Sequence, residues 1–295
     1  MEIWSACRAL SLPPADFLKG FGIGRCMTST ARLFTATSVP LRYLVIPKCG
    51  CTFVKNLLWL VDHGQAHPNP LRVHDDDALF GRADQLGLSP SDIRSEPMAF
   101  TVLRNPVDRF LSLYFDKVVG EGWKQFVPLR QTLVRHGLDP HAADKEAHRK
   151  NCLIMANWIA ENLAFGLDLP SNAHWTPQSW RCKTLQDLDL HLLVLDFLRP
   201  QLRALAGGDV PELDDYLESA ERNRSAAPTN RRQIVTDSLR SQINNIYSRD
   251  RRLYRQARAS WEAHAPVVPR YSDLGQVKPW KIRSPDSQRL EHSTV

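Results

Sequence analysis

The sequence lacks any long apolar run. The run at residues 57–61, for example, covers only five positions, whereas a helix needs about 18 or more apolar residues to cross a bilayer. Near the N-terminus, Arg8 and Lys19 are not followed by a continuous apolar stretch. The sequence therefore predicts neither a membrane-spanning helix nor a secretory signal.

The chain of 295 residues lacks a regular cysteine pattern. The six cysteines are Cys7, Cys26, Cys49, Cys51, Cys152 and Cys182. This spacing does not indicate a disulfide framework. The single C-x-C has neither a second pair nor histidines at ligand spacing to complete a metal site. We therefore predict free thiols, a reducing compartment and no metal.

Acidic residues are almost missing from one stretch. Residues 222–258 contain ten arginines but only Asp237 and Asp250 as acids, and the whole chain has a formal net charge of +6. Such a stretch favours an anionic partner, whether a phosphate ligand, an acidic glycan or a nucleic acid. A solvated helix face would give the same composition, so both interpretations stay open.

Short apolar segments alternate with segments of helical periodicity. The predicted strands are residues 41–46, 98–103 and 192–197. The predicted helices are residues 52–63, 107–118, 152–163 and 236–258. This alternation predicts an α/β fold, a P-loop-like three-layer domain with a mainly parallel central sheet covered by helices. We place this domain at residues 39–264, between an irregular lead-in at 1–38 and a mobile polar tail at 265–295.

The first strand runs into the loop Pro47-Lys48-Cys49-Gly50-Cys51-Thr52. A loop at a helix N-terminus presents backbone N–H groups that bind phosphate, and glycine lets the backbone approach the ligand closely. The lysine adds positive charge and the threonine a hydroxyl group. This is not a Walker A loop, because that motif carries its lysine at the end. An ordinary strand–helix turn with an exposed lysine would look similar.

The second strand ends in Arg104-Asn105-Pro106, and the helix that follows carries Arg109 and Ser112 on one face. Asn105 suits the N-cap and Pro106 the first helical position. A guanidinium and a hydroxyl near a helix start predict a second anion site. Alternatively, the arginine pairs with a carboxylate and the serine only packs. Two anion sites at two strand ends would suit a nucleotide with phosphates at both its 5′ and 3′ positions.

Taken together, these two motifs resemble the carbohydrate sulfotransferase family (sulfotransferase family 2), which includes Golgi chondroitin sulfotransferases and bacterial relatives. The resemblance implies transfer of a sulfuryl group from 3′-phosphoadenosine 5′-phosphosulfate (PAPS) to a hydroxyl, taken to be on a carbohydrate. It implies that the first loop binds the 5′-phosphosulfate and that Arg104 and Ser112 bind the 3′-phosphate. The candidate nucleotide contacts are Pro47, Lys48, Cys49, Gly50, Cys51, Thr52, Arg104, Ser112, Asn223 and Ser225.

Two later segments also fit the resemblance. His174-Trp175-Thr176-Pro177-Gln178 looks like the family's H-W-x-P-Q stretch, and residues 247–254 resemble its C-terminal Y-x-x-D signature. The acidic residue of the family's F-E-x-L pattern is missing after Phe197. The sequence also lacks the membrane anchor and paired cysteines of Golgi members, so we expect a cytoplasmic, bacterial version.

Sulfuryl transfer needs positioning and charge stabilisation more than covalent chemistry. Lys48 is the candidate to neutralise charge on the leaving oxygen, and a histidine suits the role of general base. His74, next to three aspartates, is the first candidate base and His174 the second. A P-loop-like kinase and a non-catalytic polyanion or nucleic-acid binder are the competing functions.

Overall fold

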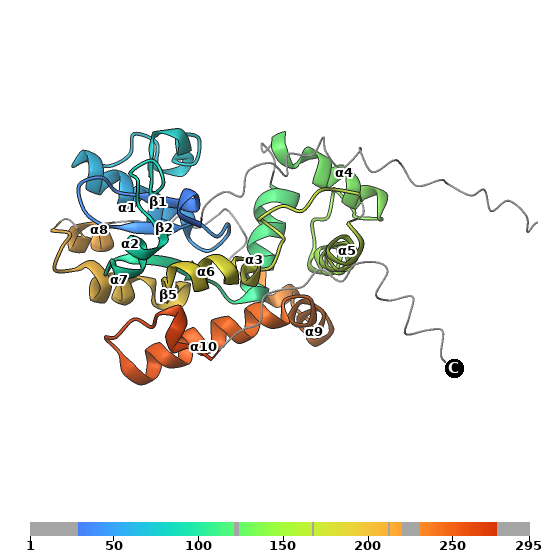
Figure 1. Cartoon of the computed structure of the whole chain (residues 1–295). Coiled ribbons are helices and arrows are strands. Elements are labelled where there is room, and N and C mark those ends of the chain that lie inside the picture. Colours follow the sequence, from blue (N-terminus) through green and yellow to red (C-terminus); the bar gives the residue numbers. More distant parts are fainter. Residues whose placement is uncertain (1–28, 121–123, 167, 212, 220–230, 276–295) are drawn as a thin grey trace, which may run out of the picture.

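The computed structural model describes residues 29–120, 124–166, 168–211, 213–219 and 231–275 (Figure 1). Its five-stranded sheet has the order β3-β1-β2-β4-β5. The strands are β1 (Leu33–Thr35), β2 (Arg42–Leu44), β3 (Gly81–Arg82), β4 (Ala99–Leu103) and β5 (His191–Val194). β2, β4 and β5 are parallel, whereas β1 pairs antiparallel with both β2 and β3. The α/β prediction is confirmed, and the two antiparallel strands extend one edge of the sheet.

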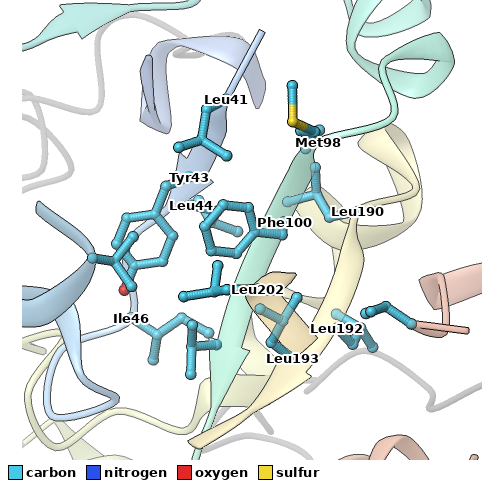
Figure 2. Packing of buried hydrophobic residues seen from close by; sticks show 14 of the residues in the cluster. Leu41, Tyr43, Leu44, Ile46, Met98, Phe100, Leu190, Leu192, Leu193 and Leu202 are labelled. Carbon is cyan, nitrogen blue, oxygen red and sulfur yellow. The ribbon is translucent and has the colours of Figure 1, made fainter. Parts of the chain in front are cut away.

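The central strands are apolar because both faces of the sheet are covered. All five residues of β4 are buried. Tyr43 and Phe100 are opposite each other in the β2–β4 register, and their rings stack with centroids 5.3 Å apart. Figure 2 shows both rings among leucines from β2 and from the β5 region. This core fixes where the strands end, and the carboxyl ends of β2 and β4 carry the two predicted loops.

Helices next to the sheet enclose this core (Figure 1). They are α1 (Cys51–His63), α2 (Pro90–Ser95), α6 (Cys182–Leu188), α7 (Leu198–Ala206) and α8 (Leu213–Ser219). The shorter 3-10 helices are Ser29–Arg32, Pro70–Arg72, Asp77–Leu79, Lys124–Phe126, Gln178–Arg181, Leu195–Phe197, Arg231–Ile234 and Tyr271–Asp273.

A second group of helices has its own hydrophobic core. It comprises α3 (Pro106–Leu113), α4 (Val127–Arg135), α5 (Lys145–Phe165) and α9 (Asp237–Ile246). Figure 1 shows this group beside the sheet, with α10 (Ser248–His264) running from α9 to the region of β5, against which it packs. The site described below lies where this helical group meets the strand ends.

Several boundaries differ from those predicted. The supposed lead-in contributes β1 to the sheet, and beyond residue 264 Val268 and Tyr271 are buried in the main core. The single helix predicted at 236–258 is two helices, because the chain breaks at Tyr247, whose hydroxyl donates to the Trp175 carbonyl at 2.7 Å. β5 ends at Val194 and continues as a 3-10 turn.

The start of α3 follows the prediction. The Asn105 side chain accepts a hydrogen bond from the Val107 N–H at 3.0 Å, and Pro106 is the first helical residue. After Leu113 the helix widens into a π-helix over Tyr114–Val119. Within the described ranges, no helix combines the length and apolar character needed to cross a membrane.

Candidate active site

The loop between β2 and α1 is shaped to present its backbone. Lys48 and Gly50 have positive φ angles of 69° and 81°, and Gly50 is the N-cap of α1 without a side-chain cap. The first N–H groups of a helix have no partner within the helix, so the start of α1 offers backbone donors of the kind that bind anions. A Cβ on Gly50 would lie 2.8 Å from the Leu195 side chain. The position therefore favours glycine for its backbone angle, and a larger residue would also displace the end of the Leu195 side chain.

A carboxylate holds the lysine of this loop. Asp116 Oδ2 lies 2.5 Å from Lys48 Nζ and 3.1 Å from Lys117 Nζ. Burial alone would raise the pKa of Asp116, but the two ammonium groups outweigh it and keep this pKa below its ordinary value. Asp116 and Lys117 both belong to the π-helix, a feature often found at functional sites. The structure thus adds two charged residues that the sequence reasoning did not name.

The two predicted anion motifs meet in space. Arg104 leaves the end of β4, and its guanidinium donates to the Lys48 carbonyl oxygen at 2.8 Å. Burial lowers the pKa of Arg104, as does the nearby charge of Arg231. Ser112 is buried on α3, eight residues further along the chain. Arg104 thus joins the first loop directly, and Arg231 is a third cation within electrostatic reach.

Gln178 joins the two loops and explains part of the H-W-x-P-Q motif. Its Oε1 accepts from the Arg104 N–H at 3.0 Å and from the Cys49 thiol at 3.2 Å, and its Nε2 donates to the Arg104 carbonyl at 2.9 Å. Burial raises the pKa of Cys49 to about 12, so this thiol keeps its proton and can donate. The buried Asp250 carboxylate in turn accepts from the N–H groups of Gln178 and Ser179, at 2.7 and 2.8 Å. Cys49 is therefore a structural thiol inside the loop.

Arg109 acts as a brace. Its side chain is 3% exposed and donates to three backbone carbonyls, those of Pro47 at 3.1 Å, Thr176 at 3.0 Å and Ala173 at 2.7 Å. The prediction that a guanidinium of this helix face joins Ser112 in an anion site is therefore wrong for Arg109. All three of its donor nitrogens are used on the backbone, and they tie the first loop to the segment around His174.

His74 contacts the first loop, and its hydrogen-bond partners determine its tautomer. Its Nδ1 is 3.0 Å from Lys55 Nζ, and its Nε2 is 3.0 Å from Thr52 Oγ1. Lys55 also pairs with Asp77, and an ammonium can only donate, so Nδ1 accepts and Nε2 carries the proton towards Thr52. Burial and the charge of Lys55 lower the pKa of His74 to about 4. The imidazole is neutral near pH 7, and its lone pair is occupied by Lys55.

His174 adopts the opposite tautomer. Its Nδ1 is 2.8 Å from Asn172 Oδ1, and its own backbone N–H donates to the same oxygen at 2.9 Å. Nδ1 therefore carries the proton, and Nε2 keeps a lone pair. Burial lowers the pKa of His174 to about 3, with further lowering by Lys117 and Lys48. Both lysines lower the pKa of His74 as well, so the two histidines share one electrostatic environment.

The remaining candidates have mixed outcomes. Cys51 Sγ and Thr52 Oγ1 lie 3.6 and 3.0 Å from His74 Nε2, which places both residues beside the first candidate base. Asn223 and Ser225 lie outside the described residues.

Comparison with known proteins decides the class. A family model described as "Sulfotransferase family" matches residues 31–255, which is most of the chain. The chain belongs to the sulfotransferase family. Searches of curated proteins and of solved structures found no match. In this sulfotransferase the matched range runs from before β1 into α10, so it includes both loops, Gln178 and Asp250. The family match supports sulfuryl transfer over the kinase and polyanion-binder alternatives.

Proposed function

We propose that this sulfotransferase takes its sulfuryl group from PAPS and transfers it to a hydroxyl of a carbohydrate. One observation carries the donor assignment, namely the 2.8 Å hydrogen bond from the Arg104 guanidinium to the Lys48 carbonyl. Through this bond the two predicted anion motifs contact each other, which supports the proposal of two neighbouring anion sites. A nucleotide phosphorylated at both 5′ and 3′ positions requires two neighbouring anion sites. The carbohydrate assignment rests on the motif resemblance.

Each end of the donor has candidate partners. The backbone N–H groups after Gly50, together with Lys48 and Thr52, suit the 5′-phosphosulfate. Arg104 and Ser112 are proposed for the 3′-phosphate, with Arg231 as an additional ligand because its charge already acts on Arg104. Burial lowers the pKa of Arg104 most, and repulsion by Arg231 adds to it. A phosphate between these two guanidiniums would relieve that repulsion.

The transfer step follows from these positions. The bond between sulfur and the bridging oxygen of the nucleotide breaks, and a bond forms between sulfur and the acceptor oxygen. Lys48 neutralises the charge that develops on the bridging oxygen. The acceptor proton passes to a general base, and the product nucleotide is 3′-phosphoadenosine 5′-phosphate (PAP).

The tautomers of His74 and His174 distinguish these two candidate bases. A general base needs an unprotonated nitrogen. His174 Nε2 is unprotonated because Nδ1 donates to Asn172, whereas the unprotonated Nδ1 of His74 already accepts from Lys55. We therefore assign the base to His174, which reverses the order suggested by sequence alone. His74 is assigned a positioning role, because its Nε2 proton orients the Thr52 hydroxyl.

Donor binding can be tested by melting the protein with PAP. PAP at about 100 times its Kd should stabilise the folded state by about 2.7 kcal/mol. That corresponds to a rise in Tm of roughly 5 to 10 °C. Arg104→Ala should abolish the rise, whereas Arg240→Gln, at an exposed arginine on α9, should retain it. The absence of any shift in the wild-type protein would refute PAPS as the donor.

Transfer itself can be followed with donor carrying labelled sulfate and a panel of oligosaccharides. Lys48→Ala should lower kcat by at least about 100-fold, as expected for a group that stabilises charge in the transition state. His174→Gln should lower kcat similarly while leaving PAP binding intact, and His74→Gln should have the smaller effect on kcat. A larger loss in His74→Gln than in His174→Gln would reverse the assignment of the base.

A further inference from the structure

A pocket of about 530 Å³ opens beside the β1–β3 edge of the sheet. This volume is in the range of pockets that bind small ligands, about 300 to 1,000 Å³. The lining residues that matter here are Arg32, Pro47, Arg82, Asp84, Ala173 and Arg181. Three of these six are arginines and one is an acid, so the pocket carries an excess of positive charge.

Two of the arginines have no anionic partner among the residues that the structure describes. Arg82 lies over the Phe34 ring, 3.5 Å from its centroid, and contacts the Asp77 carbonyl. The side chains of Arg32 and Arg181 make neither an ion pair nor a hydrogen bond within the described ranges. Burial lowers the pKa of Arg181, and the charge of Arg32 lowers it further. The two guanidiniums are therefore half-buried like charges that act on each other.

The pocket begins next to the proposed transfer centre. Pro47 and Ala173 line it, and each directly precedes a central residue, Lys48 or His174. The carbonyls of Pro47 and Ala173 are both bound by Arg109, at 3.1 and 2.7 Å, so the two walls are held close together. An acceptor with its reactive hydroxyl at the centre could extend into the pocket.

We propose that this pocket binds an anionic group of the acceptor, a carboxylate or sulfate of an acidic glycan, through Arg32 and Arg181. The inference rests on the proposed function and narrows its acceptor to one chemical class. Guanidinium groups match the geometry of such anions with paired hydrogen bonds. A bound anion would also offset the repulsion between the two arginines, whereas a neutral sugar would leave both charges uncompensated.

Direct binding tests the pocket separately from turnover. Kd would be measured by calorimetry, in the presence of PAP and in its absence, for a uronic-acid oligosaccharide, its carboxyl-reduced neutral form and a sulfated neutral analogue. Wild-type protein should bind one of the anionic forms at least tenfold more tightly than the neutral form. The preferred anion distinguishes a carboxylate from a sulfate. Equal affinity for all three would overturn the proposal.

Variants then locate the anion. Arg181→Gln should weaken binding of the preferred anionic oligosaccharide about 10- to 100-fold, as expected from losing hydrogen bonds to a charged group. Binding of the neutral form should change less than twofold. Arg32→Gln gives a second variant should Arg181→Gln fold poorly, and Arg240→Gln is the matched control. If both pocket variants keep the wild-type preference, the proposal is wrong. Because the PAP-induced rise in Tm is measured on the same proteins, failure of the donor assignment would be seen separately.

Discussion

Replacing Arg109 by lysine distinguishes two possible roles of this residue. It can hold the first loop in place, or it can bind an anion, and the sequence alone is compatible with both. Arg109 makes three hydrogen bonds to backbone carbonyls from a position that is 3% exposed. Each hydrogen bond from a charged donor contributes about 1.5 to 3 kcal/mol. A lysine keeps the positive charge, but its single nitrogen cannot reproduce the planar fork that reaches three carbonyls.

We expect Arg109→Lys to lose two of the three hydrogen bonds, which corresponds to about 3 to 6 kcal/mol of unfolding free energy. The Tm of the ligand-free protein should then fall by roughly 6 °C or more. Circular dichroism melts with and without PAP measure both this fall and the nucleotide-induced rise. Arg240→Lys, at an exposed position on α9, is the matched control and should leave both values unchanged.

A role for Arg109 in binding an anion would give a different result. An anion ligand at this position would keep the Tm of the ligand-free protein when lysine replaces arginine, and only the response to PAP would fall. A ligand-free Tm within about 2 °C of the wild-type value would therefore show that Arg109 does not brace the loop.

Three further predictions use other parts of the site. Asp116→Asn removes the carboxylate that competes for Lys48, so calorimetry should show PAP binding about five- to tenfold more tightly, and weaker binding would contradict this. The pKa values of His74 and His174 are lowered to about 4 and about 3, so the unfolded chain binds more protons below pH 6.5 and stability is lost as the pH falls. The Tm advantage of wild-type protein over His174→Gln should accordingly shrink between pH 7 and pH 4.5, and a constant difference would contradict the lowered pKa. Gly50→Ala should cost about 1 to 3 kcal/mol in urea unfolding, because its φ is positive and the new Cβ meets a leucine side chain; a variant as stable as wild type would show that the loop can adjust.

The sequence supports the fold class because the apolar segments that become β2, β4 and β5 are short and alternate with helices. Periodicity could not show β1 and β3, which cover only three and two residues. It also could not show the break at Tyr247, because that depends on a hydrogen bond to the distant Trp175 carbonyl.

Some residues of the candidate site could likewise be predicted from local motifs, whereas others could not. Lys48, Gly50 and Arg104 could be named as candidates because local motifs carry them. Asp116 was missed, although it lies only four residues after Ser112, because its role depends on a contact with Lys48 across 68 positions of the chain. The role of Gln178 likewise depends on a long-range contact, which joins it to Cys49. The proposed order of the two histidines rests on their tautomers, which only three-dimensional hydrogen-bond partners determine.

The π-helix at Tyr114–Val119 determines the direction in which the Asp116 side chain points. In an ordinary α-helix each residue turns the chain by about 100°. In a π-helix each N–H bonds five residues back instead of four, so each residue turns the chain by less than in an α-helix. An α-helix continued from Leu113 would therefore turn the Asp116 carboxylate to a direction different from the one in which it pairs with Lys48.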